Sequence, residues 1–362
     1  MLPEVLDRHQ YLSKYASLLK LLAPIDSAFE KETQFDVNNE ARVVPLLQYH
    51  ILQETVLTED LHIVEPHFLP TMLFNETWAN ITGGQRVTLM KQDEDEVFLV
   101  SGLDSRSMID YQNRDIQFFE GVIQPIDTLL IPPQPLAETI RSRIPSMAAF
   151  LGALYKTGLA DELMEAKDVT ILVPDNQAFE KVFGALSELP TAELRNVLAY
   201  HIIPDRVLYS SELQHQGQFC THATSNDKAE PLNVTITVAG NNRYIDSSAI
   251  QDPDIMIANG VAHIIADVLN PLKPNAKPDL ARKVQSSVFD LKGDATTGKT
   301  IPTPYLSDIP CLTDCAATKK TAARTRRPHA HHTPKNGAAA AKCTGVSGAE
   351  AMIGIGMLAG FL

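Results

Sequence analysis

The feature that most constrains this chain is an internal repeat of long period. Three segments recur in order: Leu21–Glu30 matches Ile171–Glu180, Val44–Leu52 matches Asn196–Ile203, and Asp115–Leu130 matches Asp254–Leu269. The offsets are 150 residues from Phe29 to Phe179, 151 from His50 to His201, and 139 from Gly121 to Gly260. Solenoid repeats have periods of about 20 to 50 residues, so the period in this chain is too long for a solenoid. The repeat therefore predicts two tandem copies of one domain, at residues 1–133 and 138–274.

The second copy has the clearer secondary-structure pattern. A helix is predicted from Ser146 to Gly158, with a capping residue at its start and a glycine at its end. Val169–Val173 is predicted as a buried strand, and Thr191 begins a further helix. Asn259-Gly260 between two apolar runs predicts a hairpin. Helices before strands make each copy an α+β module.

The order of short motifs in this copy resembles the fasciclin domain. The residues that carry the resemblance are Thr170, Pro174, Ala178 and Phe179, then Tyr200-His201, then Asp254, Ile255, Asn259, Gly260 and His263. The resemblance extends over about residues 1–272. It implies two fasciclin-like domains with helices packed on a β-sandwich-like core, in an extracellular protein of fungal type that acts in adhesion rather than catalysis.

The first copy departs from this pattern. Glu120 stands where Asn259 does, and Gln124 where His263 does. Residues 11–22 have the spacing of an amphipathic helix and lead directly to Pro24, without the strand that the second copy has there. We therefore expect the first domain to be degenerate and to lack residues near its front. A truncated start also accounts for the absence of a signal peptide from residues 1–10.

The candidate interaction residues each have two interpretations. Tyr49-His50 and Tyr200-His201 correspond to an adhesion motif of the family, but both histidines end an apolar helical stripe, which favours a core role joining helix to sheet. Asp254 and Ile255 precede the hairpin; the resemblance implies a receptor contact there, and a solvated strand start is the alternative. Asn259 and His263 complete the set.

Several modifications are predicted. Asn75, Asn80 and Asn233 each begin an N-glycosylation sequon. Cys311 and Cys315 are spaced to close a small disulfide loop, which leaves Cys220 either unpaired or bridged to one of them. Four cysteines in 362 residues exclude a disulfide-dense scaffold, so each domain depends on its core.

The two ends of the chain differ in charge. Residues 1–272 have a net charge of −20, whereas residues 273–342 have a net charge of +8. The acidic body argues against nucleic acid as a partner. Residues 275–336 are predicted to be a disordered, O-glycosylated stalk or a plain linker, because the stretch 285–335 contains twelve Ser and Thr residues. Residues 337–362 resemble a glycosylphosphatidylinositol signal with attachment at Asn336, which would be the chain's only link to a membrane.

These observations predict a non-catalytic surface glycoprotein without a cofactor or metal. Its expected partners are cell-surface or cell-wall proteins and glycans. The alternative is an accessory or scaffold subunit of a secreted enzyme complex. The run 293–300 fits a phosphate-binding loop, but no strand precedes it and Pro302 and Pro304 oppose the helix that such a loop requires.

Overall fold

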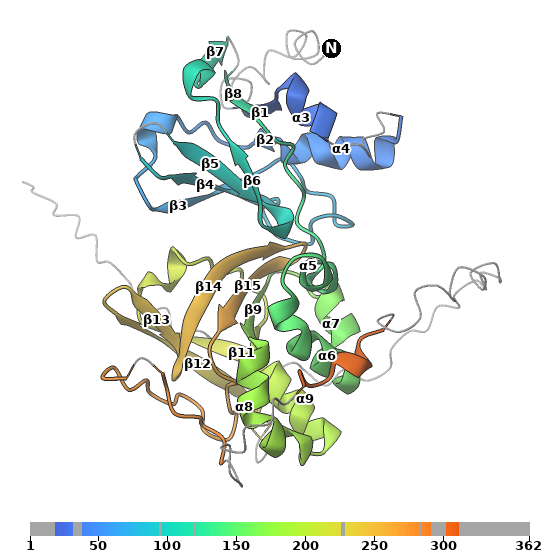
Figure 1. Ribbon diagram of the computed structural model, residues 1–362, viewed down its shortest axis with the longest axis vertical. Helices are drawn as coiled ribbons and strands as arrows, with labels where there is room; N and C mark the ends of the chain where they lie inside the picture. Colours follow the sequence, from blue (N-terminus) through green and yellow to red (C-terminus); the bar gives the residue numbers. More distant parts are fainter. Residues whose placement is uncertain are drawn as a thin grey trace, which may run out of the picture.

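The computed structural model describes residues 19–31, 38–93, 96–118, 121–225, 229–282, 284–290 and 302–310. Two α+β domains follow one another along the chain, the first at the top of Figure 1 and the second below it. The predicted order of helices and strands is confirmed in the second copy, where the hairpin at Asn259-Gly260 joins two long strands.

The second domain is built on one seven-stranded sheet. Its order is β10-β9-β15-β14-β13-β12-β11. The strands are β9 (Val169–Pro174), β10 (Ile202–Ile203), β11 (Gly217–Thr224), β12 (Pro231–Ala239), β13 (Asn242–Ile245), β14 (Ser248–Ile257) and β15 (Gly260–Ile265). β9 and β15 are parallel, and the other pairs are antiparallel. Every residue of β9 and β15 is buried, because side chains cover both faces of the sheet there.

Five helices cover one face of this sheet (Figure 1). They are α5 (Leu136–Ser142), α6 (Ala148–Thr157), α7 (Ala160–Glu165), α8 (Asn176–Ser187) and α9 (Thr191–Ala199). α6 ends at Gly158 in the left-handed region, where a glycine avoids the strain of a Cβ. α8 begins where the Asp175 carboxylate accepts a hydrogen bond from the Ala178 N–H at 2.6 Å. Phe150 and Phe179 are fully buried between helices and sheet.

The first domain repeats this topology with two smaller sheets. β1 (Leu19–Pro24), β2 (Ile51–Leu52), β7 (Ile116–Phe118) and β8 (Gly121–Ile126) form one sheet, in the order β2-β1-β8-β7. β3 (Pro66–Pro70), β4 (Arg86–Lys91), β5 (Val97–Ser101) and β6 (Ser105–Met108) form the other. The helices described here are α3 (Asp26–Lys31) and α4 (Glu40–Tyr49).

The expectation that the first copy has no strand before Pro24 is wrong. Leu19–Pro24 is β1, and it pairs in parallel with β8 in the register that β9 keeps with β15. The helix expected at 11–22 is therefore wrong from Leu19 onward; residues 11–18 lie outside the described residues. Lys20 explains the wrong prediction. A lysine interrupts the apolar pattern of a buried strand, although the Lys20 side chain is fully buried in β1.

The expectation of a disordered stalk from 275 onward is also wrong in part. Residues 302–310, which we call the docked segment, pack against α6 and α8, beside α6 in Figure 1. The Tyr305 side chain is 8% exposed, and its ring lies 6.1 Å from Phe179 and 5.7 Å from Phe183. Gly152 makes this approach possible, because a Cβ there would lie 2.0 Å from the Tyr305 carbonyl oxygen. The docked segment thus belongs to the core of the second domain.

Cys220 on β11 is disulfide-bonded, so the interpretation that left it unpaired is wrong. The three other cysteines, Cys311, Cys315 and Cys343, lie outside the described residues, as do Asn336 and the phosphate-loop match at 293–300. None of the helices among the described residues combines the length and the apolar composition of a transmembrane span.

Candidate functional site

The Tyr-His histidines lie in the interior of both domains. His201 is fully buried; its Nδ1–H donates to the Val197 carbonyl at 2.8 Å, and its Nε2 accepts the Leu269 N–H at 3.0 Å. His50 makes the same two bonds, to Leu46 at 2.8 Å and from Leu130 at 3.1 Å. Each histidine thus ties the end of a helix to the segment that follows the last strand of its domain.

Burial keeps both histidines neutral. It lowers the pKa of His201 from 6.5 to about 4, and it lowers the pKa of His50 in the same direction. Because neither ring reaches solvent, a partner cannot touch either histidine in this conformation.

The tyrosines of the motif are also buried, with their hydroxyls bonded inside the domains. The Tyr200 hydroxyl lies 2.8 Å from Asp246 Oδ2 and 2.8 Å from the Asn233 carbonyl. The Tyr49 hydroxyl donates to the Arg86 carbonyl at 2.8 Å. Burial raises the pKa of both tyrosines well above the ordinary value of 10.

Asp254 and His263 face each other across the β14–β15 hairpin. The Asp254 N–H donates to His263 Nδ1 at 3.1 Å, and His263 Nε2–H donates to the Leu208 carbonyl at 2.8 Å. Asp254 has a φ of 66° at an irregularity in the ladder, and its carboxylate accepts the Ser210 N–H at 2.7 Å. This pair fixes a bulge in β14 and the loop beside it.

The first domain repeats this bond to an aspartate of positive φ with a different side chain. Asp115 has a φ of 55°, and its N–H donates to Gln124 Oε1 at 2.9 Å. The Asp115 carboxylate accepts hydrogen bonds from the N–H and hydroxyl of Thr58, whereas that of Asp254 accepts one from the N–H of Ser210. The glutamine therefore replaces the histidine as acceptor, a substitution visible in the aligned sequence copies.

Asn259 closes the other end of the hairpin. Its Nδ2 donates to the carbonyls of Leu163 and Ala166, both at 2.8 Å, and its side chain is buried. The next residue, Gly260, allows the close approach of β9, because a Cβ there would lie 1.8 Å from the Val169 carbonyl oxygen. Asn259 is thus a structural anchor for the end of α7.

The two domains meet through hydrogen bonds of Asn80 and Thr82, which the sequence marks only as parts of a glycosylation sequon. Asn80 Nδ2 donates to the carbonyls of Glu165 at 3.1 Å and Ala166 at 3.2 Å. The Asn80 N–H donates to the Ala258 carbonyl at 2.9 Å. The Asp168 carboxylate accepts from the N–H of Thr82 at 2.6 Å and from its hydroxyl at 2.5 Å. We call these contacts of Asn80 and Thr82 the domain joint.

Aromatic packing extends the domain joint. The rings of Phe68 in the first domain and Tyr209 in the second are stacked with centroids 4.2 Å apart. The Arg86 guanidinium lies 5.7 Å from the centroid of Tyr209. Buried Gln85 adds a bond from its Nε2 to the Ile257 carbonyl at 3.1 Å. Apolar stacking and buried hydrogen bonds together indicate a specific contact between the domains.

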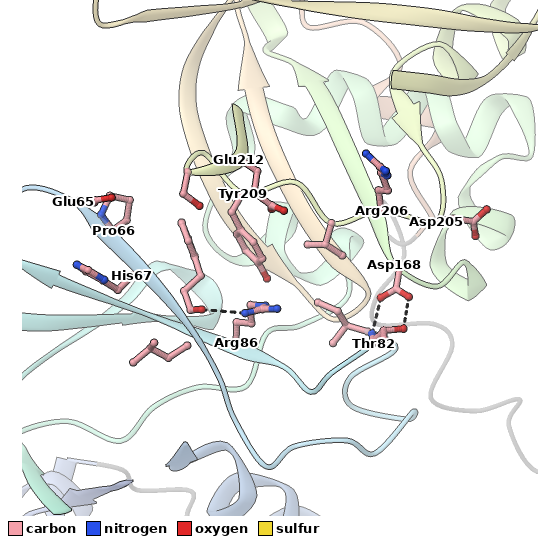
Figure 2. Close-up of a pocket in the computed structure, with 15 residues that line it drawn as sticks. Glu65, Pro66, His67, Thr82, Arg86, Asp168, Asp205, Arg206, Tyr209 and Glu212 are labelled. Carbon is pink, nitrogen blue, oxygen red and sulfur yellow. Dashed lines mark hydrogen bonds between the residues drawn. The ribbon is translucent and has the colours of Figure 1, made fainter. Parts of the chain in front are cut away.

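Two clefts flank this contact. The first, of about 690 Å³, is lined by carboxylates of both domains and by Arg86 and Arg206, as Figure 2 shows. In that view Asp168 lies beside Thr82, while Tyr209 is beside Arg86. The carboxylates are those of Glu65, Asp168, Asp205 and Glu212.

The second cleft, of about 680 Å³, contains the strand entry that the sequence singled out. Asp252, Asp254 and Ile255 line it, together with three arginines from both domains: Arg106, Arg143 and Arg243. Asp252 is exposed at the cleft, but neighbouring atoms partly desolvate its carboxyl, and this desolvation together with the nearby charges of Asp104 and Asp254 raises its pKa. Of the sequence candidates, Asp254 and Ile255 thus lie at a cleft between the domains.

The three sequons have different surroundings. Asn75 is exposed, and its Oδ1 accepts the Thr77 N–H at 2.9 Å. Asn233 lies on β12 with its Oδ1 buried. Asn80 belongs to the domain joint. Among the residues described, no three His, Cys, Asp or Glu side chains are grouped to hold a metal ion.

Comparison with known proteins agrees with this architecture. The model of the fasciclin domain matches residues 7–132 and 145–271, which is more than half of the chain. The chain therefore belongs to the fasciclin family and carries two fasciclin domains in tandem.

Several curated fungal proteins are similar to this chain. A fasciclin-like arabinogalactan protein of Arthroderma benhamiae is 31% identical over 213 residues, covering 59% of this chain and 48% of the relative. The fasciclin-like arabinogalactan protein elcF of Phaeosphaeria nodorum is 25% identical over 292 residues, covering 74% and 88%. Aurofusarin biosynthesis cluster protein S of Gibberella zeae is 23% identical, covering 52% and 55%. The chain thus spans about half the length of the Arthroderma benhamiae and Gibberella zeae relatives.

Proposed function

We propose that this protein is a non-catalytic extracellular glycoprotein that mediates adhesion at the cell surface or wall. Its partners are surface proteins or glycans, and its link to the membrane is a lipid anchor at Asn336. The observation that carries the proposal is the joined pair of fasciclin domains, with two clefts of mixed charge at the junction.

The chemistry of the second cleft suits such a partner. Arginines and carboxylates from both domains face one opening, and they can bind charged or hydroxyl-rich groups through hydrogen bonds. The buried Tyr-His pairs lie away from this surface, so their part in adhesion is to keep the domains folded. The cleft residues are the ones that a partner would touch.

Charge reversal tests this proposal. In cells that display the full chain, Asp252→Lys in the second cleft and Glu65→Lys in the first should each lower adhesion severalfold. The matched control is Glu188→Lys, an exposed residue after α8 that lines neither cleft. Equal adhesion by all three variants and the unaltered protein would show that the clefts do not contribute to adhesion.

A second candidate function is an accessory subunit of a secreted biosynthetic enzyme. The observation that favours it is the similarity to a protein whose name places it in a biosynthesis cluster. Co-purification of the secreted protein separates the two candidates. A stoichiometric enzyme partner supports the accessory role, and lost adhesion on gene deletion without such a partner supports the adhesive one.

A further inference from the structure

Two sequons lie five residues apart in the first domain, yet their asparagines have different tasks. Asn75 is exposed at a turn, where its side chain accepts a hydrogen bond from Thr77 through Oδ1. Asn80 is partly buried and directs its Nδ2 at two carbonyls of the second domain. The nitrogen that would carry a glycan at Asn80 is thus one of the donors that hold the domains together.

The other parts of this sequon are engaged as well. Thr82, the third sequon residue, gives both its N–H and its hydroxyl to the Asp168 carboxylate. The Asn80 main chain donates to the Ala258 carbonyl at 2.9 Å and accepts from the Asp168 N–H at 3.4 Å. The whole tripeptide is therefore part of the domain joint.

We propose that Asn80 is a glycosylation site that controls the joint: a chain with a glycan on Asn80 has its two domains undocked, and a chain without one has them docked. In the modification, Nδ2 attacks C1 of a lipid pyrophosphate-linked oligosaccharide. The N–C1 bond forms, the C1–O bond to pyrophosphate breaks, the lipid pyrophosphate leaves, and Nδ2 loses one proton. The proposal rests on the extracellular route of the proposed function.

The physical reason is loss of a donor combined with added bulk. The substituted Nδ2 keeps one hydrogen for the carbonyls of Glu165 and Ala166, and a pyranose ring stands at the boundary of the domains. Carbonyls that lose their donor in a partly buried contact are costly. The glycan and the docked arrangement therefore exclude each other.

The order of synthesis allows both forms to arise from one chain. Asp168 is made 88 residues after Asn80, which at ordinary elongation rates takes on the order of ten seconds. The sequon is therefore accessible before its partner in the second domain exists. Chains that receive the glycan in that interval stay undocked.

Secretion of the full chain behind a leader peptide tests the proposal directly. Size-exclusion chromatography separates compact from extended molecules, and mass spectrometry of glycopeptides reports each site. We expect glycan on Asn75 in both fractions, and glycan on Asn80 in the extended fraction alone. A glycosylated Asn80 in the compact fraction overturns the proposal, and so does a bare Asn80 in both fractions.

A matched pair of substitutions tests the joint without any glycan. In unglycosylated full-length protein, Asn80→Arg adds bulk at the joint and should increase the radius of gyration, with faster exchange of the Thr82 and Asp168 amides. Asn75→Arg should change neither. Protection of the β4 amides reports that the first domain stays folded; a compact Asn80→Arg protein with a protected β4 contradicts the proposal.

The two proposals fail in distinguishable ways. Glycan on Asn75 with a bare Asn80 in both fractions overturns the joint proposal alone. Adhesion that is unchanged by the cleft variants overturns the proposed function alone.

Discussion

The main-chain N–H of Asp254 is held by the Nδ1 of His263 at 3.1 Å, and this bond keeps Asp254 in the left-handed region. The first domain keeps the same backbone geometry at Asp115 with Gln124 in place of the histidine. The two domains thus use different side chains to accept a hydrogen bond from the main-chain N–H of an aspartate with positive φ. The requirement is for a hydrogen-bond acceptor beside the positive-φ aspartate rather than for an imidazole.

This equivalence predicts that glutamine is tolerated at position 263. His263→Ala should lower the free energy of unfolding of the second domain by about 3 kcal/mol, because it leaves the Asp254 N–H and the Leu208 carbonyl unpaired and opens a cavity. His263→Gln should cost about 1 kcal/mol. Urea denaturation measures both, and equal costs for the two variants would contradict the equivalence.

His201 predicts a dependence of stability on pH. Its folded pKa of about 4 lies below the ordinary 6.5, so between these values the unfolded chain binds more protons than the native one. Stability therefore falls as pH drops from 6.5 to 4, by about 3 kcal/mol from this group. Denaturation midpoints at pH 7 and pH 4.5 check this, and His201→Gln should reduce the difference between them. An unchanged difference would assign the acid sensitivity to other groups.

Buried Lys20 predicts a stabilising substitution. Its Nζ donates to the Val56 carbonyl, where the second domain uses the Thr170 hydroxyl to bind the Arg206 carbonyl. Burial lowers the pKa of Lys20 from 10.5 to about 8, so its charged form costs stability at neutral pH.

Lys20→Met should therefore raise the free energy of unfolding at pH 7 by about 2 kcal/mol. The advantage should shrink as pH rises from 8 to 10.5, since the native lysine is then neutral while the unfolded chain still binds the proton. The control is Lys277→Met at an exposed position. A Lys20→Met gain that does not vary with pH would show that charge burial is not its cause.

The packing of the docked segment should depend on the absence of a side chain at Gly152. Gly152→Ala places a Cβ 2.0 Å from the Tyr305 carbonyl oxygen and should displace residues 302–310, at a cost of about 2 kcal/mol. Hydrogen exchange in this segment is the measurement. The same change at Gly184 in α8, where nothing lies within 4 Å, should be neutral or stabilise by up to about 1 kcal/mol. Unaltered exchange in Gly152→Ala would contradict the tight contact.

Removal of the Tyr209 hydroxyl should leave the stability of the protein unchanged or increase it. Its Oη is buried, and among the described residues it has no hydrogen-bond partner. Tyr209→Phe keeps the stack on Phe68 and removes the unpaired group, so stability should stay equal or rise by about 1 kcal/mol. Tyr209→Ala should instead separate the domains, which small-angle scattering detects. A destabilised Tyr209→Phe would reveal a bond made by that hydroxyl.

The sequence by itself determined that this chain holds two copies of one α+β domain. Periodicity, glycine and asparagine positions, and spaced motifs are local properties, and they predicted α6, β9, α9 and the β14–β15 hairpin in the second domain. They also paired Gln124 with His263 as equivalent positions, although the shared task of these residues needed the structure.

Only the tertiary structure decided what joins distant segments. Asn80 has the letters of a sequon, and its contact with Glu165 and Ala166 depends on how two domains pack. Tyr305 lies in a Pro- and Thr-rich tail, yet a groove over Gly152 buries it. Lys20 broke the pattern of a strand that pairing with β8 nevertheless forms. In each case the deciding free energy comes from partners far along the chain, which no local pattern contains.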